Sequence, residues 1–177
     1  MDFLSRLLFR HEPFREANLH LKAVLGAMVG VLLAGGLAAL IKTPLLMAPL
    51  GPTSVLLFAQ PENPSSQPIN VFGGYFIAAS FGVVAELMWP GIWWVAVLAT
   101  GLAMGLMLIL RVTHPPAASV PLALLSSPMS PVPLFALMLA STALLVGLAT
   151  LAHRLPPRVI YPRMRPPAVL PPDQTTR

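Results

Sequence analysis

Cysteine is absent from this chain, and charged residues are scarce. Without a thiol, disulfides, thiolate metal sites and cysteine nucleophiles are all excluded. Charged residues make up 10% of the 177 positions and hydrophobic residues 56%, with a mean hydropathy of +0.77, whereas about a quarter of the residues in soluble domains are charged. The bilayer is therefore the expected solvent, and little length remains for a soluble domain.

Catalytic and metal-binding motifs are also missing. The histidines are dispersed along the chain, and no H-E-x-x-H, G-x-S-x-G or P-loop pattern occurs. We therefore expect no enzymatic activity, no metal and no cofactor. The expected partners are the lipid bilayer and a small solute, with no nucleic acid among them.

Four long hydrophobic runs indicate membrane-spanning helices. They cover residues 23–41, about 71–88, about 93–110 and 134–152. At 1.5 Å per residue the first run is about 28 Å long, close to the thickness of the hydrocarbon core. The predicted fold class is an all-α integral membrane protein with four transmembrane helices.

Two further apolar segments, residues 42–59 and 111–125, are interrupted by proline. Proline removes an N–H donor and clashes with the preceding turn, which disfavours a continuous helix. Unpaired backbone is costly in lipid, so each break must be covered by protein or line a wet cavity. We expect re-entrant segments or short half-helices.

The order of span, broken segment, loop and span occurs in residues 23–88 and again in 93–152. GPTSVLL (51–57) aligns with PAASVPL (116–122), which indicates an internal two-fold repeat. Re-entrant segments would give four crossings and parallel repeats, whereas short crossing helices would give six crossings and inverted repeats. Both arrangements place the termini on one side. A length of about 14–17 residues is short for a span and favours re-entry.

The net charge of +5 is concentrated near the two ends of the chain. Basic flanks stay in the cytoplasm, so we predict a multi-pass protein with both termini cytoplasmic, in a bacterial inner (cell) membrane. Residues 1–21 form a leader, either an interfacial helix or a poorly ordered segment. Residues 22–152 form the transmembrane domain. Residues 153–177 form a Pro- and Arg-rich tail that we expect to be extended and solvated.

The two breaks are the predicted binding site, because half-helix N-termini expose N–H donors near the membrane midplane. Proline suits the first turn of such a helix, where a missing N–H has no consequence. Two N-termini facing one another would bind a small anion through dipoles and hydrogen bonds. The predicted residues are Gly51, Pro52, Thr53 and Ser54 in the first break, and Pro115, Pro116, Ala117, Ala118 and Ser119 in the second.

Ionisable residues at membrane depth add to this site. Arg111 and His114 would share a face if the third helix continues that far, so that the pair attracts an anion and binds a coupled proton. Alternatively, Arg111 anchors the helix at the surface and His114 bonds a carbonyl freed by the prolines. Glu86, one turn before Trp89, is either an interfacial carboxylate or a proton-relay group.

Small residues on the predicted helices favour close helix packing. Gly26 and Gly30 have the G-x-x-x-G spacing, and so do Gly101 and Gly105. A small bundle with such faces is expected to self-associate, and we therefore expect a homo-oligomer.

At THPPAASVPLA (113–123) the sequence resembles the HPP family of small integral membrane proteins, whose His-Pro-Pro stands here as His114, Pro115 and Pro116. APLGPTSVLLFA (48–59) and QPENPSSQPINVFGG (60–74) extend the resemblance over about residues 20–152. It implies four membrane-spanning helices and, from plastid and cyanobacterial members, nitrite transport. Some relatives carry a CBS regulatory domain, which this sequence lacks, so nucleotide regulation by that route is not expected. The motif residues carried over are Pro49, Gly51, Pro52, Thr53, Ser54, His114, Pro115, Pro116, Ala117 and Ser119.

The leading hypothesis is a membrane transporter for a small monovalent anion such as nitrite, with His114 carrying a coupled proton. The alternative is a non-transporting membrane module that assembles or regulates a partner protein through its tail and its small-residue helix faces.

Overall fold

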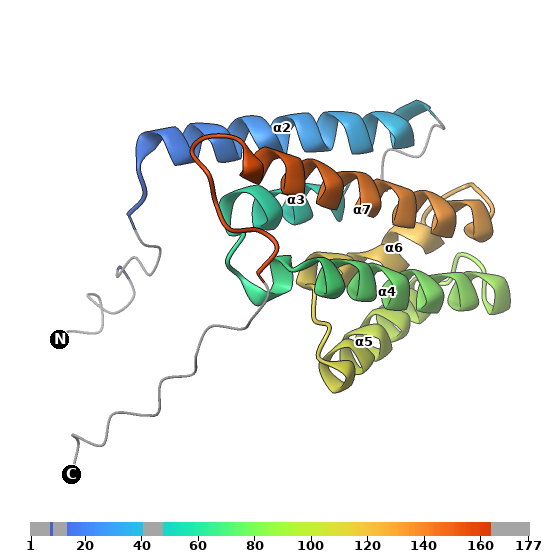
Figure 1. The fold of residues 1–177 in the computed structure, drawn as a ribbon. Helices are drawn as coiled ribbons and strands as arrows, with labels where there is room; N and C mark the ends of the chain where they lie inside the picture. The colour runs from blue at the N-terminus through green and yellow to red at the C-terminus, as the bar shows by residue number, and fades with distance from the viewer. Residues whose placement is uncertain (1–7, 9–13, 41–47, 164–177) are drawn as a thin grey trace, which may run out of the picture.

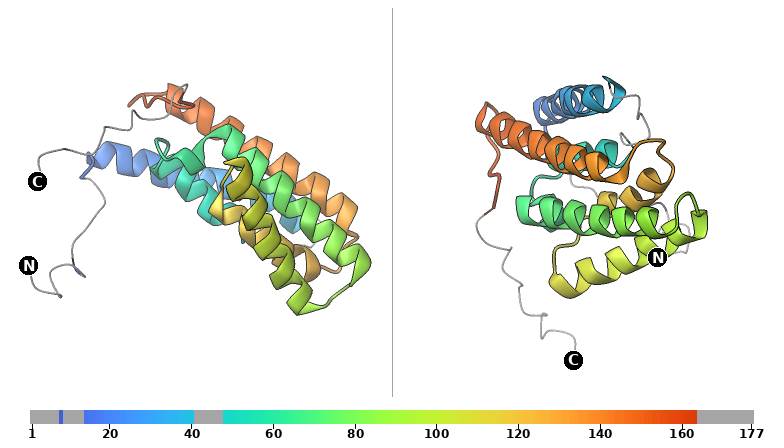
Figure 2. Two further views of the ribbon diagram at one scale, coloured as in Figure 1. Left: turned by 90° about the horizontal axis from the view of Figure 1, so that it is seen from below. Right: turned by 90° about the vertical axis from the view of Figure 1, so that its right-hand side faces the viewer.

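The computed structural model describes Leu8, residues 14–40 and residues 48–163, and within these ranges the chain is helical without any strand. Four long helices lie side by side, with shorter helices among them (Figures 1 and 2). All four are long and apolar enough to cross a membrane, which confirms the predicted fold class. They are α2 (Ala17–Leu40), α4 (Pro68–Met88), α5 (Trp93–Leu110) and α7 (Pro131–Arg154).

The first long helix begins at Ala17, six residues before the predicted start of the span. The end of the predicted leader is therefore the first turn of α2. Apart from Leu8 and residues 14–16, the rest of the leader lies outside the described residues.

Both proline-broken segments contain short helices, and proline stands near the start of each. Pro49 is the N-cap of the short helix in the first segment, and Pro115 and Pro116 begin the short helix in the second. The first N–H groups of a helix have no intrahelical partner, so proline costs no hydrogen bond there. Residues 41–47 of the first segment lie outside the described residues. The first segment contains α3 (Leu50–Ala59), and the second contains the 3₁₀-helix η3 (Pro115–Ser119) and α6 (Val120–Leu125). A further 3₁₀-helix, η2 (Pro64–Ser66), lies in the loop between α3 and α4.

Helix α3 runs antiparallel to α2. Near its end, Phe58 packs against Gly26 and Gly30 of α2, whereas Gly51 near its start lines a groove with Gly35. Leu40, the last residue of α2, and Ala59, the last residue of α3, therefore lie at opposite ends of the bundle (Figure 1).

The second segment runs parallel to α4 and likewise connects the two ends of the bundle. His114 packs against Gly74 near the start of α4, and Leu124 packs against Gly82 farther along. The re-entrant path favoured by segment length is therefore wrong. A 3₁₀-helix rises about 2.0 Å per residue and extended backbone about 3.3 Å, so a segment containing both reaches farther than an α-helix of equal length.

The order long, short, long therefore occurs twice, and the two halves run in opposite directions. Opposite directions of the two halves are what an inverted repeat requires. The sequence duplication itself stays a prediction.

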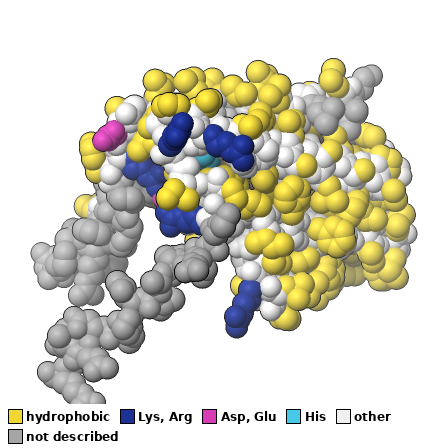
Figure 3. All heavy atoms as spheres, viewed as in Figure 1, with side chains coloured by type: hydrophobic (Ala, Val, Ile, Leu, Met, Phe, Trp, Pro, Cys, Tyr) yellow, Lys and Arg dark blue, Asp and Glu magenta, His cyan; other side chains and the backbone are white. Residues whose placement is uncertain are grey.

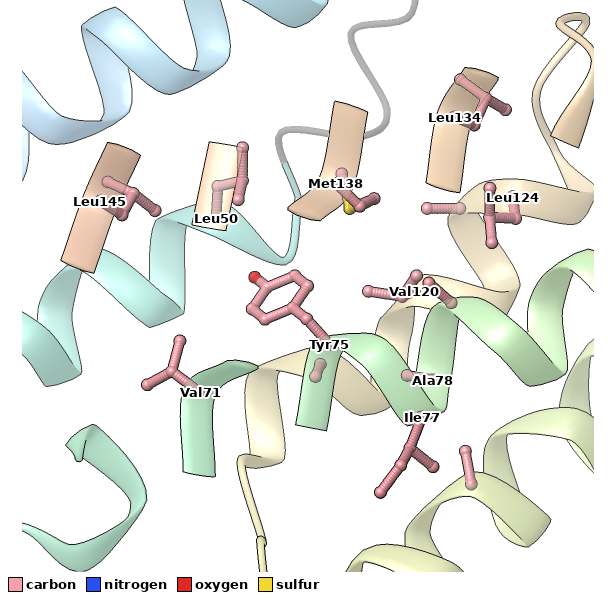
Figure 4. Packing of buried hydrophobic residues seen from close by; sticks show 14 of the residues in the cluster. Leu50, Val71, Tyr75, Ile77, Ala78, Val120, Leu124, Leu134, Met138 and Leu145 are labelled. Carbon is pink, nitrogen blue, oxygen red and sulfur yellow. The ribbon is translucent and has the colours of Figure 1, made fainter. Parts of the chain in front are cut away.

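The core lies where α3, α4, α6 and α7 meet, and Tyr75 is its largest fully buried side chain. Figure 4 shows Tyr75 pointing from α4 toward Leu50 of α3, with Met138 of α7 nearby. Large apolar side chains such as Leu32 of α2 and Leu98 of α5 are exposed. Hydrophobic side chains cover most of the bundle face seen in Figure 3, which suits contact with lipid.

The glycine pairs differ in their surroundings. Gly26 and Gly30 face Phe58, so their predicted role in close packing is confirmed. Gly101 and Gly105 have no described atom within 4 Å of an added Cβ, so no described residue packs closely on them. Self-association through that face stays a prediction.

The Lys and Arg side chains of the described ranges gather at the end of the bundle where α2 begins and α5 and α7 end (Figure 3). Lys22 of α2 donates hydrogen bonds to the carbonyls of Leu155 and Pro157, each at 2.7 Å. Arg15 forms an ion pair with Glu62 in the loop between α3 and α4.

The chain after α7 packs back onto this end. Tyr161 is buried, and its hydroxyl donates to the Ser66 carbonyl at 2.9 Å; burial raises the pKa of this phenol and keeps it a donor. Arg163 N–H donates to Gln67 at 2.8 Å. The prediction of a solvated tail is therefore wrong at Tyr161, although Leu155, Arg158 and Ile160 are exposed, and residues 164–177 lie outside the described residues.

Single cysteines test the direction of the short helices, since the natural chain contains none to react in the background. We expect Pro64→Cys and Arg158→Cys to react with a membrane-impermeant maleimide from the same side, because residues 66 and 67 bond residues 161 and 163. Pro90→Cys and Ser126→Cys should react from the opposite side. A re-entrant first segment predicts instead that Pro64→Cys reacts on the side of Ser126→Cys.

Candidate functional site

The site is built around His114, which follows the end of α5. Arg111 adopts a left-handed conformation (φ 56°) that ends the helix, and Val112 N–H then bonds the Met107 carbonyl at 3.0 Å. His114 has extended backbone (φ −132°, ψ 94°) and is the N-cap of η3. Its side chain is turned inward and has no exposed surface.

Three elements hold the His114 ring. Nδ1 lies 2.7 Å from the Ser65 carbonyl oxygen of η2, and Nε2 lies 2.9 Å from Thr53 Oγ1 of α3. The ring also packs on Tyr75 of α4, with ring centroids 5.6 Å apart. Gly74 makes this approach possible, because a Cβ there would lie 2.7 Å from the His114 Cβ.

Thr53 joins the two broken segments directly. Besides His114, its hydroxyl lies 2.8 Å from the Pro49 carbonyl oxygen and 2.8 Å from the Tyr75 hydroxyl. Thr53 and Tyr75 are both fully buried. The proline-containing motifs predict Thr53 and His114 in one site but do not indicate Tyr75 or the Ser65 carbonyl. The available signal was a tyrosine in an apolar span, because a buried phenol needs a hydrogen-bond partner.

Arg111 and Glu86 are not brought to this junction. The helix ends at Leu110, so the predicted common face of Arg111 and His114 does not form: Arg111 is exposed and His114 is buried. Glu86 accepts a hydrogen bond from Gly91 N–H at 3.1 Å. It stands about 18 Å along α4 from Gly74, at 1.5 Å per residue.

The predicted N–H donors are partly occupied within the helices. Thr53 N–H bonds the Pro49 carbonyl at 3.3 Å, because α3 begins at Leu50 and not at Pro52. Ala117 N–H bonds the His114 carbonyl at 3.0 Å, because a 3₁₀-helix pairs each N–H three residues back. The prediction of free donors at Thr53 and Ala117 is therefore wrong.

The remaining predicted residues make no side-chain hydrogen bond to His114 in the described part of the chain. The Ser119 hydroxyl donates to the Pro116 carbonyl at 2.9 Å. The Ser54 hydroxyl is buried and has no hydrogen-bond partner among the described residues. Gly51 lines the groove along α2, Pro52 and Pro115 are exposed, and Ala118 is half-buried. No three His, Asp or Glu side chains in the described part of the chain are grouped to hold a metal.

Four spanning helices enclosing a buried polar junction define a multi-pass α-helical integral membrane protein. A family model described as "HPP, transmembrane region" matches residues 12–162, well over half of the chain. The chain belongs to this HPP family. No curated protein and no solved structure matches it.

Substitution of Gly74 by alanine tests how closely α4 and His114 approach. The new Cβ would lie 2.7 Å from the His114 Cβ, which cannot rotate away, so we expect Gly74→Ala to destabilise the fold by about 1–3 kcal/mol. Gly101→Ala is the matched control in open space, and should stabilise by roughly 0.5–1 kcal/mol through helix propensity. Thermal unfolding in detergent measures the stability of both variants. Equal shifts in their unfolding temperatures would contradict the close approach of Gly74 to His114.

Proposed function

We propose that this protein transports a small monovalent anion, nitrite-like, across the membrane, with a proton carried by His114. The observation that supports this proposal is the 2.9 Å contact between Thr53 and His114, which joins the two broken segments. Broken helices meeting within a bundle are typical of substrate sites in secondary transporters. A buried ionisable residue at such a place is a functional residue by default.

The surroundings of the junction favour an anion. The carboxylates Glu62 and Glu86 are engaged elsewhere, with Arg15 and with Gly91 N–H. The group at the junction that can become charged by binding a proton is the imidazole of His114, and its charged form is a cation. The burial of Thr53 and His114 favours a small substrate, and the family resemblance supplies nitrite as the first candidate.

The distribution of charge favours one orientation. Lys22, Arg111 and Arg154 all lie at the end of the bundle that carries the ordered tail. Basic residues are retained in the cytoplasm, so we propose that both termini are cytoplasmic. Arg111 then acts as an interfacial anchor.

Uptake of labelled nitrite into proteoliposomes tests the proposed function. We expect saturable uptake that an inwardly directed proton gradient accelerates. His114→Gln should reduce the initial rate to the background of empty liposomes, because glutamine cannot carry the proton. Glu86→Gln is the matched control and should keep the wild-type rate, because Glu86 lies at the other end of α4.

Two results would contradict this proposal. One is nitrite uptake no faster than in empty liposomes, tested across the pH range in which the protein stays folded. The other is uptake indifferent to both the proton gradient and His114→Gln. Flux that never saturates with nitrite concentration would identify a channel instead of a carrier.

A further inference from the structure

A groove between α2 and α7 opens at the basic end of the bundle. Its volume is about 470 Å³, within the range of about 300–1,000 Å³ that is typical of ligand pockets. Phe58 of α3 lies at its base and packs against Gly26 of α2. Its apolar walls include Leu21, Leu25 and Val29 of α2, and Leu148 and Ala152 of α7. The groove therefore suits a hydrocarbon chain.

The polar groups of the groove lie at one end. There it is lined by Asn18 and Lys22 of α2 and by Pro156 and Pro157 of the chain after α7, which turns back toward α2 (Figure 1). Lys22 directly precedes the hydrophobic run that begins at Ala23, so its ammonium lies at the level of the lipid headgroups. Apolar walls with a cation at one end match the two parts of a phospholipid.

Lys22 has one N–H to spare for a ligand. An ammonium carries three hydrogens, and two of them are donated to the carbonyls of Leu155 and Pro157, each at 2.7 Å. These carbonyls carry no formal charge. Within the described residues no carboxylate pairs with Lys22, and Glu62 pairs instead with Arg15. A half-buried cation is stabilised by an opposite charge, so the remaining N–H favours an anionic group.

The length of the groove distinguishes a lipid from a second copy of the chain. From Asn18 to Val29 the wall formed by α2 rises about 16 Å, at 1.5 Å per residue. This length is about half of the roughly 30 Å thickness of the hydrocarbon core, which is the depth of one leaflet. A spanning helix of a partner crosses both leaflets, whereas a lipid acyl chain ends near the midplane.

We propose that this groove binds one anionic phospholipid from the leaflet on the basic side of the protein. The headgroup phosphate accepts the remaining N–H of Lys22, and one acyl chain lies between α2 and α7 on Phe58. Arg158, the exposed residue after Pro157, adds a second positive charge nearby. A zwitterionic lipid also carries a phosphate, but its own cation offsets the attraction of these charges.

The bound lipid has a structural role that does not depend on the proposed transport. Helix α2 is the least buried of the four spanning helices, and the groove separates its first half from the end of α7. A lipid in the groove contacts both helices and the chain after α7. Its binding therefore stabilises the folded protein.

Thermal unfolding of the natural chain in neutral detergent tests the class of lipid, because a ligand of the folded state raises the unfolding temperature. We expect phosphatidylglycerol to give a saturable increase. Phosphatidylcholine with the same acyl chains should need about tenfold more lipid for the same increase. Inorganic phosphate should give no increase. Equal potency of the two lipids would overturn the proposal, and so would an equal increase with inorganic phosphate, which would identify a free-anion site.

Two matched pairs of variants test the position of the lipid. Lys22→Gln should weaken phosphatidylglycerol binding about tenfold, whereas Arg154→Gln removes the same charge at the same end, outside the groove, and should leave binding unchanged. Val29→Trp fills the groove and should abolish the increase in unfolding temperature. Val24→Trp, at a similarly exposed position of α2 outside the groove, should retain it.

Each increase is measured against the same variant without lipid, so the stability of the variant itself does not affect the comparison. Binding that is unchanged in Lys22→Gln, or equal in the two tryptophan variants, would overturn the proposal. An oligomer that Val29→Trp dissociates and Val24→Trp leaves intact would also overturn it, because a second copy of the chain would then occupy the groove.

Discussion

One side-chain contact, between the Thr53 hydroxyl and His114 Nε2, unites the parts of this structure that proline would otherwise leave unsupported. Each broken segment is too short and too interrupted to be stable alone in a bilayer, where backbone groups without partners are costly. Together the segments satisfy polar groups from both halves: a Pro49 carbonyl, a Ser65 carbonyl, a phenol and an imidazole. The long helices exclude lipid from this junction.

The four long helices could be predicted because their signal is local. An apolar run of sufficient length identifies a spanning helix without knowledge of its neighbours, and proline marks the breaks. The path of the second broken segment could not be predicted from residue number alone, because its 3₁₀-helix and the extended backbone of His114 cover more distance per residue than an α-helix. The end of α5 at Leu110 was predicted, but the left-handed conformation of Arg111 that turns the chain there was not, because this conformation is uncommon for residues other than glycine.

The partners within the site were harder to predict, because they are distant in sequence. Thr53 meets Tyr75 and His114 across 22 and 61 positions, and Tyr161 meets Ser66 across 95. Thr53 and His114 entered the predicted site because both belong to proline-containing motifs. The apolar span around Tyr75 indicates that its hydroxyl needs a partner but does not identify that partner. Tyr161 belongs to the expected solvated tail, so no local pattern indicated that its hydroxyl binds a buried carbonyl.

The short turn η2 has a mechanical consequence. Ser65 holds the His114 ring, while its neighbour Ser66 accepts from Tyr161 and donates to the Leu56 and Gln60 carbonyls at 3.0 and 2.8 Å. The ring is thus fastened to the first half of the protein although its backbone belongs to the second. The imidazole therefore links the two halves. A shift of one half against the other would require either that the hydrogen bond between His114 and Ser65 breaks or that the backbone around His114 moves.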